Sequence, residues 1–169
     1  IFLLTSPDGI HWDDSDNLEA VSDRRNEGAF NVTWDARDRL YRAYSIEREP
    51  TEDVDLRRRV ITYTESPALE GPWKDSHAIV EPNSWDDAAA KRKYGALRAE
   101  YYDLSGFRYN NVHIGLVGAL YVTAEKIPGE KNQMPCDGPI DAQMMFSRDG
   151  INWHHADRER TQAIPRGGP

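Results

Sequence analysis

A seven-residue motif that occurs twice is the feature that most constrains the fold of this chain. Residues 6–12 (SPDGIHW) and 147–153 (SRDGINW) share Ser, Asp-Gly, Ile and Trp, and each follows a short apolar run. Asp-Gly favours a tight turn, because glycine adopts a positive φ without steric cost and the Ser and Asp side chains can bond the amides of the turn. A looser copy spans residues 66–73 and ends at Trp73. The motif therefore predicts three similar turns in one repeated architecture.

The rest of the chain reads as antiparallel β-structure, because short runs rich in β-branched and aromatic residues alternate with turn residues. A helix is expected over Asp86–Arg98, where acidic residues precede basic ones. Long loops are expected over Arg48–Leu56 and Lys126–Gly138. The expected strands are Ala29–Trp34, Leu40–Ile46, Arg59–Thr64, Tyr101–Tyr109, Val112–Thr123 and Ile140–Phe146.

The spacing of the turns favours a β-propeller. Trp12, Trp73 and Trp153 lie 61 and 80 positions apart, which accommodates four short strands per repeat plus insertions. Repeats of this size in an all-β chain are typical of propeller blades. Three ordinary hairpins of a β-sandwich are the alternative. With 169 residues the chain has enough material for one modest core, so residues 1–169 are expected to be part of a single domain.

Composition excludes several classes of partner. The chain has 29 acidic and 21 basic residues and a net charge of -8, so its field repels nucleic acids and anionic membranes, and neither is an expected partner. Cys136 is the single cysteine, which excludes an internal disulfide and a cysteine-based zinc site.

The motifs together resemble the five-bladed propellers of glycoside hydrolase families 32 and 43 and their uncharacterised relatives. The turns are similar to the family's "S-x-D-G-x-x-W" and "S-x-x-L-x-G-P-W" patterns, and residues 138–143 (GPIDAQ) are similar to the start of a third strand in those relatives. The resemblance implies a five-bladed β-propeller, of which this chain would be a fragment of about two to three blades. Because cut blades expose strand edges, we expect an oligomer or a longer parent chain.

The resemblance also implies carbohydrate chemistry in a central channel, and glycoside hydrolysis needs two carboxyl groups beside the scissile bond. Glu100 precedes an expected innermost strand, and Asp141 alternates with apolar residues of its strand, so these two are the candidate catalytic residues. The Asn-Asp-Pro-Asn run of family 32 is absent from the sequence. The candidate substrate-binding residues are Glu27, Asn31, Tyr101, Tyr102, Asp103 and Gln143.

Two other functions stay open at this point. One is a carbohydrate-binding propeller without catalysis, and the other is a phosphorolytic relative that would use Arg98 and Arg108 to hold an anion. No cofactor and no metal are expected from the residues, since the five histidines lack zinc-ligand spacing. Because some family 43 relatives place a histidine near a channel calcium, the resemblance leaves calcium open at His113.

Overall fold

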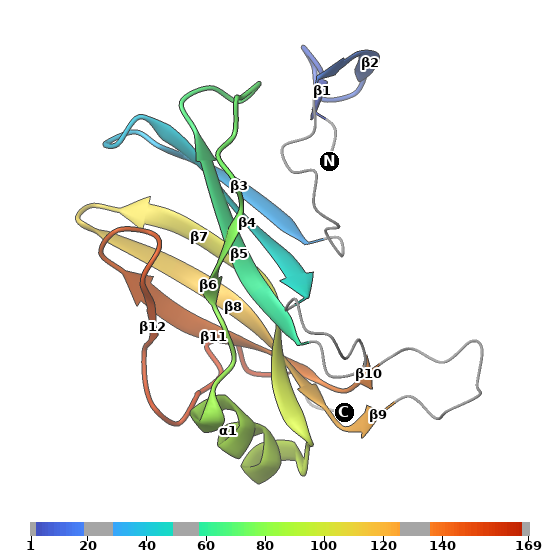
Figure 1. Cartoon of the computed structure of the whole chain (residues 1–169), viewed down its shortest axis with the longest axis vertical. Helices are drawn as coiled ribbons and strands as arrows, with labels where there is room; N and C mark the ends of the chain where they lie inside the picture. Colours follow the sequence, from blue (N-terminus) through green and yellow to red (C-terminus); the bar gives the residue numbers. More distant parts are fainter. Residues whose placement is uncertain (1–2, 19–28, 49–57, 126–135, 167–169) are drawn as a thin grey trace.

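The computed structural model describes residues 3–18, 29–48, 58–125 and 136–166 of the chain (Figure 1). Strands make up most of this part, and its single helix is α1. The elements are β1 (Leu3–Thr5), β2 (Asp13–Leu18), β3 (Phe30–Asp35), β4 (Leu40–Arg48), β5 (Arg59–Ser66), β6 (His77–Val80), α1 (Ser84–Tyr94), β7 (Arg98–Tyr109), β8 (Val112–Val122), β9 (Ala124–Glu125), β10 (Cys136–Asp137), β11 (Ile140–Ser147) and β12 (Trp153–His155).

Two four-stranded antiparallel sheets dominate the described structure (Figure 1). The first sheet has the order β3-β4-β5-β6, and the second has the order β7-β8-β11-β12. The described residues also form two two-stranded sheets, β1-β2 and β9-β10. The all-β class is confirmed, and each of the six expected strands is present with its ends moved by a few residues at most.

Two of the three motif turns occupy the same place in the strand order. Residues 66–73 connect the third and fourth strands of the first sheet, and residues 147–153 do the same in the second sheet. Residues 6–12 connect β1 and β2. The sequence repeat therefore corresponds to a repeat of structure.

The helix differs from its expected range at both ends. It begins earlier because Asn83 caps it, accepting a hydrogen bond from the amide of Trp85, while Asp86 bonds the amide of Asn83 in return. It ends at Tyr94 because Gly95 adopts the left-handed conformation, with φ of 63°. The expected end at Arg98 is wrong, since that residue begins β7.

One hydrophobic core joins the two large sheets. β7 contacts β3, β4 and β5, so the second sheet packs its inner face on the first sheet. The Trp153 ring lies over Gly106 and Gly115, where a Cβ at Gly115 would come within 2.8 Å of the ring. The glycines thus make room for the largest side chain of the motif. The buried cluster includes Tyr44, Ile46, Ile61, Tyr63, Tyr101, Leu104, Val117, Ala119, Met145 and Trp153.

The other face of the second sheet carries Glu100 and Asp103 toward one end and also has an exposed apolar surface. Cross-strand partners share a face, so the register defines this surface, which we call the open face. Phe107, Tyr109, Ile140 and Met144 are exposed there, at 37% to 59% of their surface. The open face consists of Phe107, Tyr109, Val112, Ile114, Leu116, Ile140, Met144 and Phe146.

Candidate functional site

A charged cluster lies at the start of β7. Glu100 is 0% exposed, and guanidinium groups hold both of its carboxylate oxygens. Arg59 reaches Oε2 at 2.8 Å from the first residue of β5, and Arg98 reaches Oε1 at 2.9 Å from β7 itself. The Glu100 carboxylate is thus shared by two guanidinium groups, and its pairing with Arg59 links β7 of the second sheet to β5 of the first.

A bulge gives the start of β7 its geometry. Tyr101 pairs with Ala119 and Asp103 pairs with Gly118, so Tyr102 is an extra residue without a partner of its own in the ladder. Bulges often re-aim side chains next to active sites. The Tyr102 ring packs on Leu120 and Val122, and the Arg59 guanidinium lies over it at 5.3 Å.

The bulge brings Glu100 and Asp103 to the same face. Glu100 pairs with Leu120 and Asp103 with Gly118, and these two partners are alternate residues of β8. Alternate residues of a strand point the same way and lie about 6.6 Å apart. The two carboxyl groups therefore lie on neighbouring positions of one face.

The surroundings of the Glu100 and Asp103 carboxyl groups differ. Asp103 is half-buried, and burial raises the pKa of its carboxyl, although a hydrogen bond from the Gly118 amide acts in the opposite direction. Among the described residues no lysine or arginine is ion-paired to Asp103, whereas Glu100 has two arginines. Gly118 allows this position, because a Cβ there would meet the Asp103 carboxylate. Two carboxyl groups with unlike environments are the arrangement that general acid catalysis uses.

Asp141 lies on the opposite face of the second sheet from Glu100 and Asp103. It pairs with Ala119, the neighbour of Leu120 in β8, so its side chain is on the inner face while Glu100 is on the opposite one. The Asp141 carboxylate accepts hydrogen bonds from Tyr94, Gln162 and Arg166 at 2.6 to 3.0 Å. The structure does not bring Glu100 and Asp141 together; Asp141 links β11 to the helix and to the C-terminal segment.

Tyr101 and Gln143 share the inner face with Asp141. The Tyr101 hydroxyl lies 2.8 Å from Nε2 of His155, and the Gln143 amide donates to the hydroxyl of Tyr121. The Gln143 Oε1 atom is buried and has no hydrogen-bond partner within the described ranges. Both side chains thus belong to the core beside α1.

One of the expected substrate-binding residues, Asn31, is in β3. Asn31 lies opposite Tyr44, and its Oδ1 atom is buried without a hydrogen-bond partner in the part of the chain that the structure describes. Such an oxygen is a place where a ligand or water donor can bind. Glu27 lies outside the described residues.

Sequence reasoning missed a buried network at the other end of the strands. Asp35 accepts hydrogen bonds from Arg42 within the first sheet and from Arg108 of the second sheet, at 2.8 to 3.0 Å. Its Oδ1 also accepts from the amides of Arg37 and Asp38, which stabilises the turn after β3. The pairing of Asp35 with Arg108 joins residues 73 positions apart, so no local pattern in the sequence indicates it.

This network bears on the phosphorolytic alternative. Arg108 is bonded to Asp35 and Asp38, and Arg98 is bonded to Glu100. Both arginines that this alternative would use are therefore already hydrogen-bonded to carboxylates. A further anion site would have to displace those bonds.

His113 is fully buried beside the same network. Its Nε2 atom lies 3.7 Å from Asp35, and neither ring nitrogen has a hydrogen-bond partner among the residues described. Burial lowers the pKa of His113, and the charges of Arg108 and Arg42 lower it further. No group of three or more His, Cys, Asp or Glu side chains in the described residues is arranged to hold a metal ion.

No described helix combines the length and the apolarity needed to cross a membrane. Neither the models of known protein families nor the curated protein sequences gave a match to this chain.

Proposed function

We propose that the two large sheets are neighbouring blades of a five-bladed β-propeller that acts on carbohydrate. Three observations support this fold: each sheet takes its four strands in chain order, the motif turn joins the third and fourth strands, and the first strands β3 and β7 contact each other. First strands that meet in this way are what innermost strands around a channel require.

Within that fold, the start of β7 is the proposed site of glycoside hydrolysis. The observation that carries the proposal is the pair Glu100 and Asp103, two carboxyl groups on one face in unlike surroundings. Asp103 is the general acid, since burial favours its protonated form. Glu100, held between Arg59 and Arg98, is the second carboxyl of the pair: it takes the proton of the water that attacks the sugar while Asp103 gives its proton to the leaving oxygen. Tyr102 offers an aromatic ring beside them.

The second candidate is carbohydrate binding without catalysis. It is favoured by the complete burial of Glu100 and by the guanidinium groups on both of its oxygens, since such a carboxylate has little freedom to activate water. Asp141 is occupied in the same way by Tyr94, Gln162 and Arg166.

Asp103→Asn separates the two candidates. The assay is release of reducing ends from a panel of soluble polysaccharides, with binding measured by calorimetry on the same panel. For the hydrolase we expect kcat to fall about 100-fold or more, because the amide cannot donate the proton, while binding is retained. In the active enzyme, kcat should decline as the pH rises through the raised pKa of Asp103.

Ser105→Ala is the matched control, since Ser105 is an exposed residue of β7 on the same face. A wild-type chain that binds but releases no reducing ends supports the second candidate. Full turnover by Asp103→Asn would remove Asp103 as the acid.

A further inference from the structure

The two close copies of the motif fold alike to within about 0.2 Å in their hydrogen bonds. The Ser6 hydroxyl accepts from the Gly9 amide at 2.8 Å, and the Ser147 hydroxyl accepts from the Gly150 amide at 2.9 Å. The aspartate of each copy then accepts from the amides two and three residues later, at 2.8 to 2.9 Å in both. The two turns present the same backbone shape.

Their apolar side chains differ in what covers them. Trp153 is 8% exposed, whereas Trp12 is 60% exposed and Ile10 is 76% exposed. The turn of residues 147–153 is docked, and the turn of residues 6–12 is free. We call the latter the free turn.

The docked turn lies on the first sheet. The Tyr44 hydroxyl donates to the carbonyl of Gly150 at 3.0 Å, and the Trp153 ring meets the Tyr44 ring edge to face at 5.7 Å. Ile151 lines a cavity of about 630 Å³ with Tyr63, Glu65 and other residues of the first sheet. This face of the first sheet is thus a receptor for the motif turn.

The second sheet has the corresponding surface, and it is uncovered. The two sheets can be aligned on the serine that begins each motif turn. Ser66 pairs with Tyr41 in the first sheet, and Ser147 pairs with His113 in the second. Counting back from the two serines, Tyr63 and Glu65 correspond to Met144 and Phe146. In the same alignment, Tyr44 corresponds to Leu116. These three residues belong to the open face.

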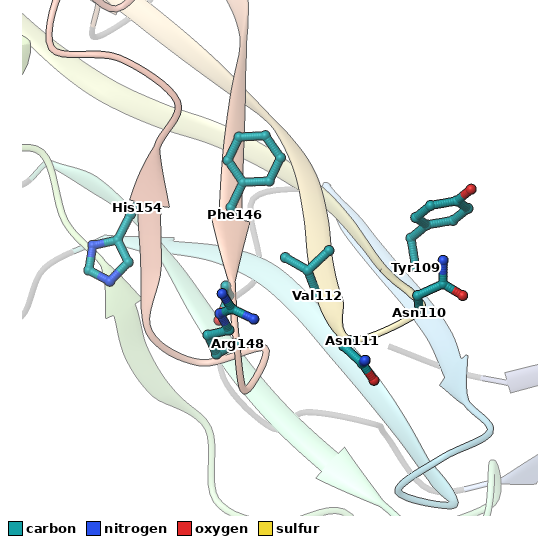
Figure 2. Close-up of a pocket in the computed structure, with 8 residues that line it drawn as sticks. Tyr109, Asn110, Asn111, Val112, Phe146, Arg148 and His154 are labelled. Carbon is teal, nitrogen blue, oxygen red and sulfur yellow. The ribbon is translucent and has the colours of Figure 1, made fainter.

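A cavity of about 600 Å³ marks the place at the end of the open face (Figure 2). Figure 2 shows Phe146 and Val112 on adjacent strands, with Tyr109 and Asn110 at the hairpin on one side and His154 on the other. Arg148 also lines the cavity and has no ion pair among the described residues. The cavity therefore combines the apolar side chains of Val112 and Phe146 with polar groups that include Arg148.

We propose that the free turn of one copy of this chain docks on the open face of a second copy, head to tail. The turn has the backbone that the first sheet already receives, and its Ile10 and Trp12 match the apolar Leu116, Met144 and Phe146 of the second sheet. Because the two surfaces differ, the contact is heterologous. The inference does not depend on the carbohydrate proposal.

Sedimentation velocity over a range of about 1 to 100 µM tests the inference on the whole chain. The wild type should associate as its concentration rises. Trp12→Ala removes the ring of the free turn, and Met144→Glu places a charge on the open face; each should weaken self-association by about tenfold or more. Trp85→Ala is the matched control, because Trp85 is a similarly exposed tryptophan on α1 and should leave association unchanged.

Mixing the two variants gives the decisive measurement. Trp12→Ala keeps an intact open face and Met144→Glu keeps an intact free turn, so the mixture should form a complex that neither variant forms alone. Circular dichroism checks that each variant is folded, and Ile10→Asp replaces Trp12→Ala if the latter is not. A wild type that stays monomeric, a mixture that does not associate, or a self-association lost in Met144→Glu but kept in Trp12→Ala would each overturn the inference.

Discussion

Asp35 shows how one buried side chain joins two sheets. Burial acts to raise the pKa of its carboxyl, but hydrogen bonds from Arg108, the Asp38 amide and Arg42 outweigh burial and lower the pKa to about 2. The charged form therefore binds two buried guanidinium groups, Arg42 and Arg108, which both also pair with the less buried Asp38. The stability that Asp35 contributes depends on its ionisation.

We predict that Asp35→Asn destabilises the fold by about 2 to 3 kcal/mol at neutral pH, because it removes the buried carboxylate between Arg42 and Arg108 and leaves Asp38 as the counter-charge that they share. An unfolded aspartate titrates near pH 3.9, so the contribution of Asp35 is fully present above about pH 4 and is lost as the pH falls through about 2. That loss amounts to about 2 kcal/mol. Urea denaturation of the wild type and of Asp35→Asn between pH 2 and 7 measures this loss of stability. Asp75→Asn, at an exposed position, should change stability by less than about 0.5 kcal/mol; an equal effect of the two substitutions would contradict the prediction.

At the same scale, the sequence indicated where individual residues lie within a strand but not what they face. Alternation along residues 140–146 correctly separates Asp141 and Gln143 from the apolar set. It does not relate Asp141 to Glu100, because that relation depends on the register of both strands with β8. The arginine partners of Glu100 come from β5 and β7, and no local pattern announces the first of them.

At the scale of elements, the motif turn offers a matched pair of tryptophans. Trp153→Ala should cost about 3 to 5 kcal/mol, because it opens a cavity over Gly106 and Gly115. Trp12→Ala should change stability by about 0.5 kcal/mol or less, since its ring is mostly exposed. Both are measured by chemical denaturation at about 1 µM, where self-association is weakest. Similar costs for the two would show that burial does not distinguish them.

Elements were predictable to the extent that their signals are local. The six expected strands are present because β-branched and aromatic runs between turn residues need no distant information. The helix ends before its expected range does because Gly95 caps it, and a glycine after basic residues is a local stop signal. The Tyr102 bulge could not be predicted, since an extra residue is defined only against the partner strand.

At the scale of the whole molecule, the described sheets should unfold as one unit. The core cluster spans both sheets, and ion pairs of Asp35 with Arg108 and of Glu100 with Arg59 cross between them. We therefore predict a single transition in urea, with tryptophan fluorescence and far-ultraviolet circular dichroism coinciding. Arg108→Gln should lower the midpoint without separating the two signals. Two resolved transitions in the wild type would contradict this cooperativity.

The order of the strands has a consequence for how such a chain can grow over evolutionary time. Each large sheet completes its own hydrogen-bonded ladder from strands that follow one another in the chain. A duplication of the coding stretch for one sheet adds a whole ladder and interrupts none, and the new copy brings both a turn to dock and a face to receive one. Insertions between strands, such as the one that contains β9 and β10, leave the ladder order unchanged. Lengthening by whole units is thus the change that disturbs this architecture least.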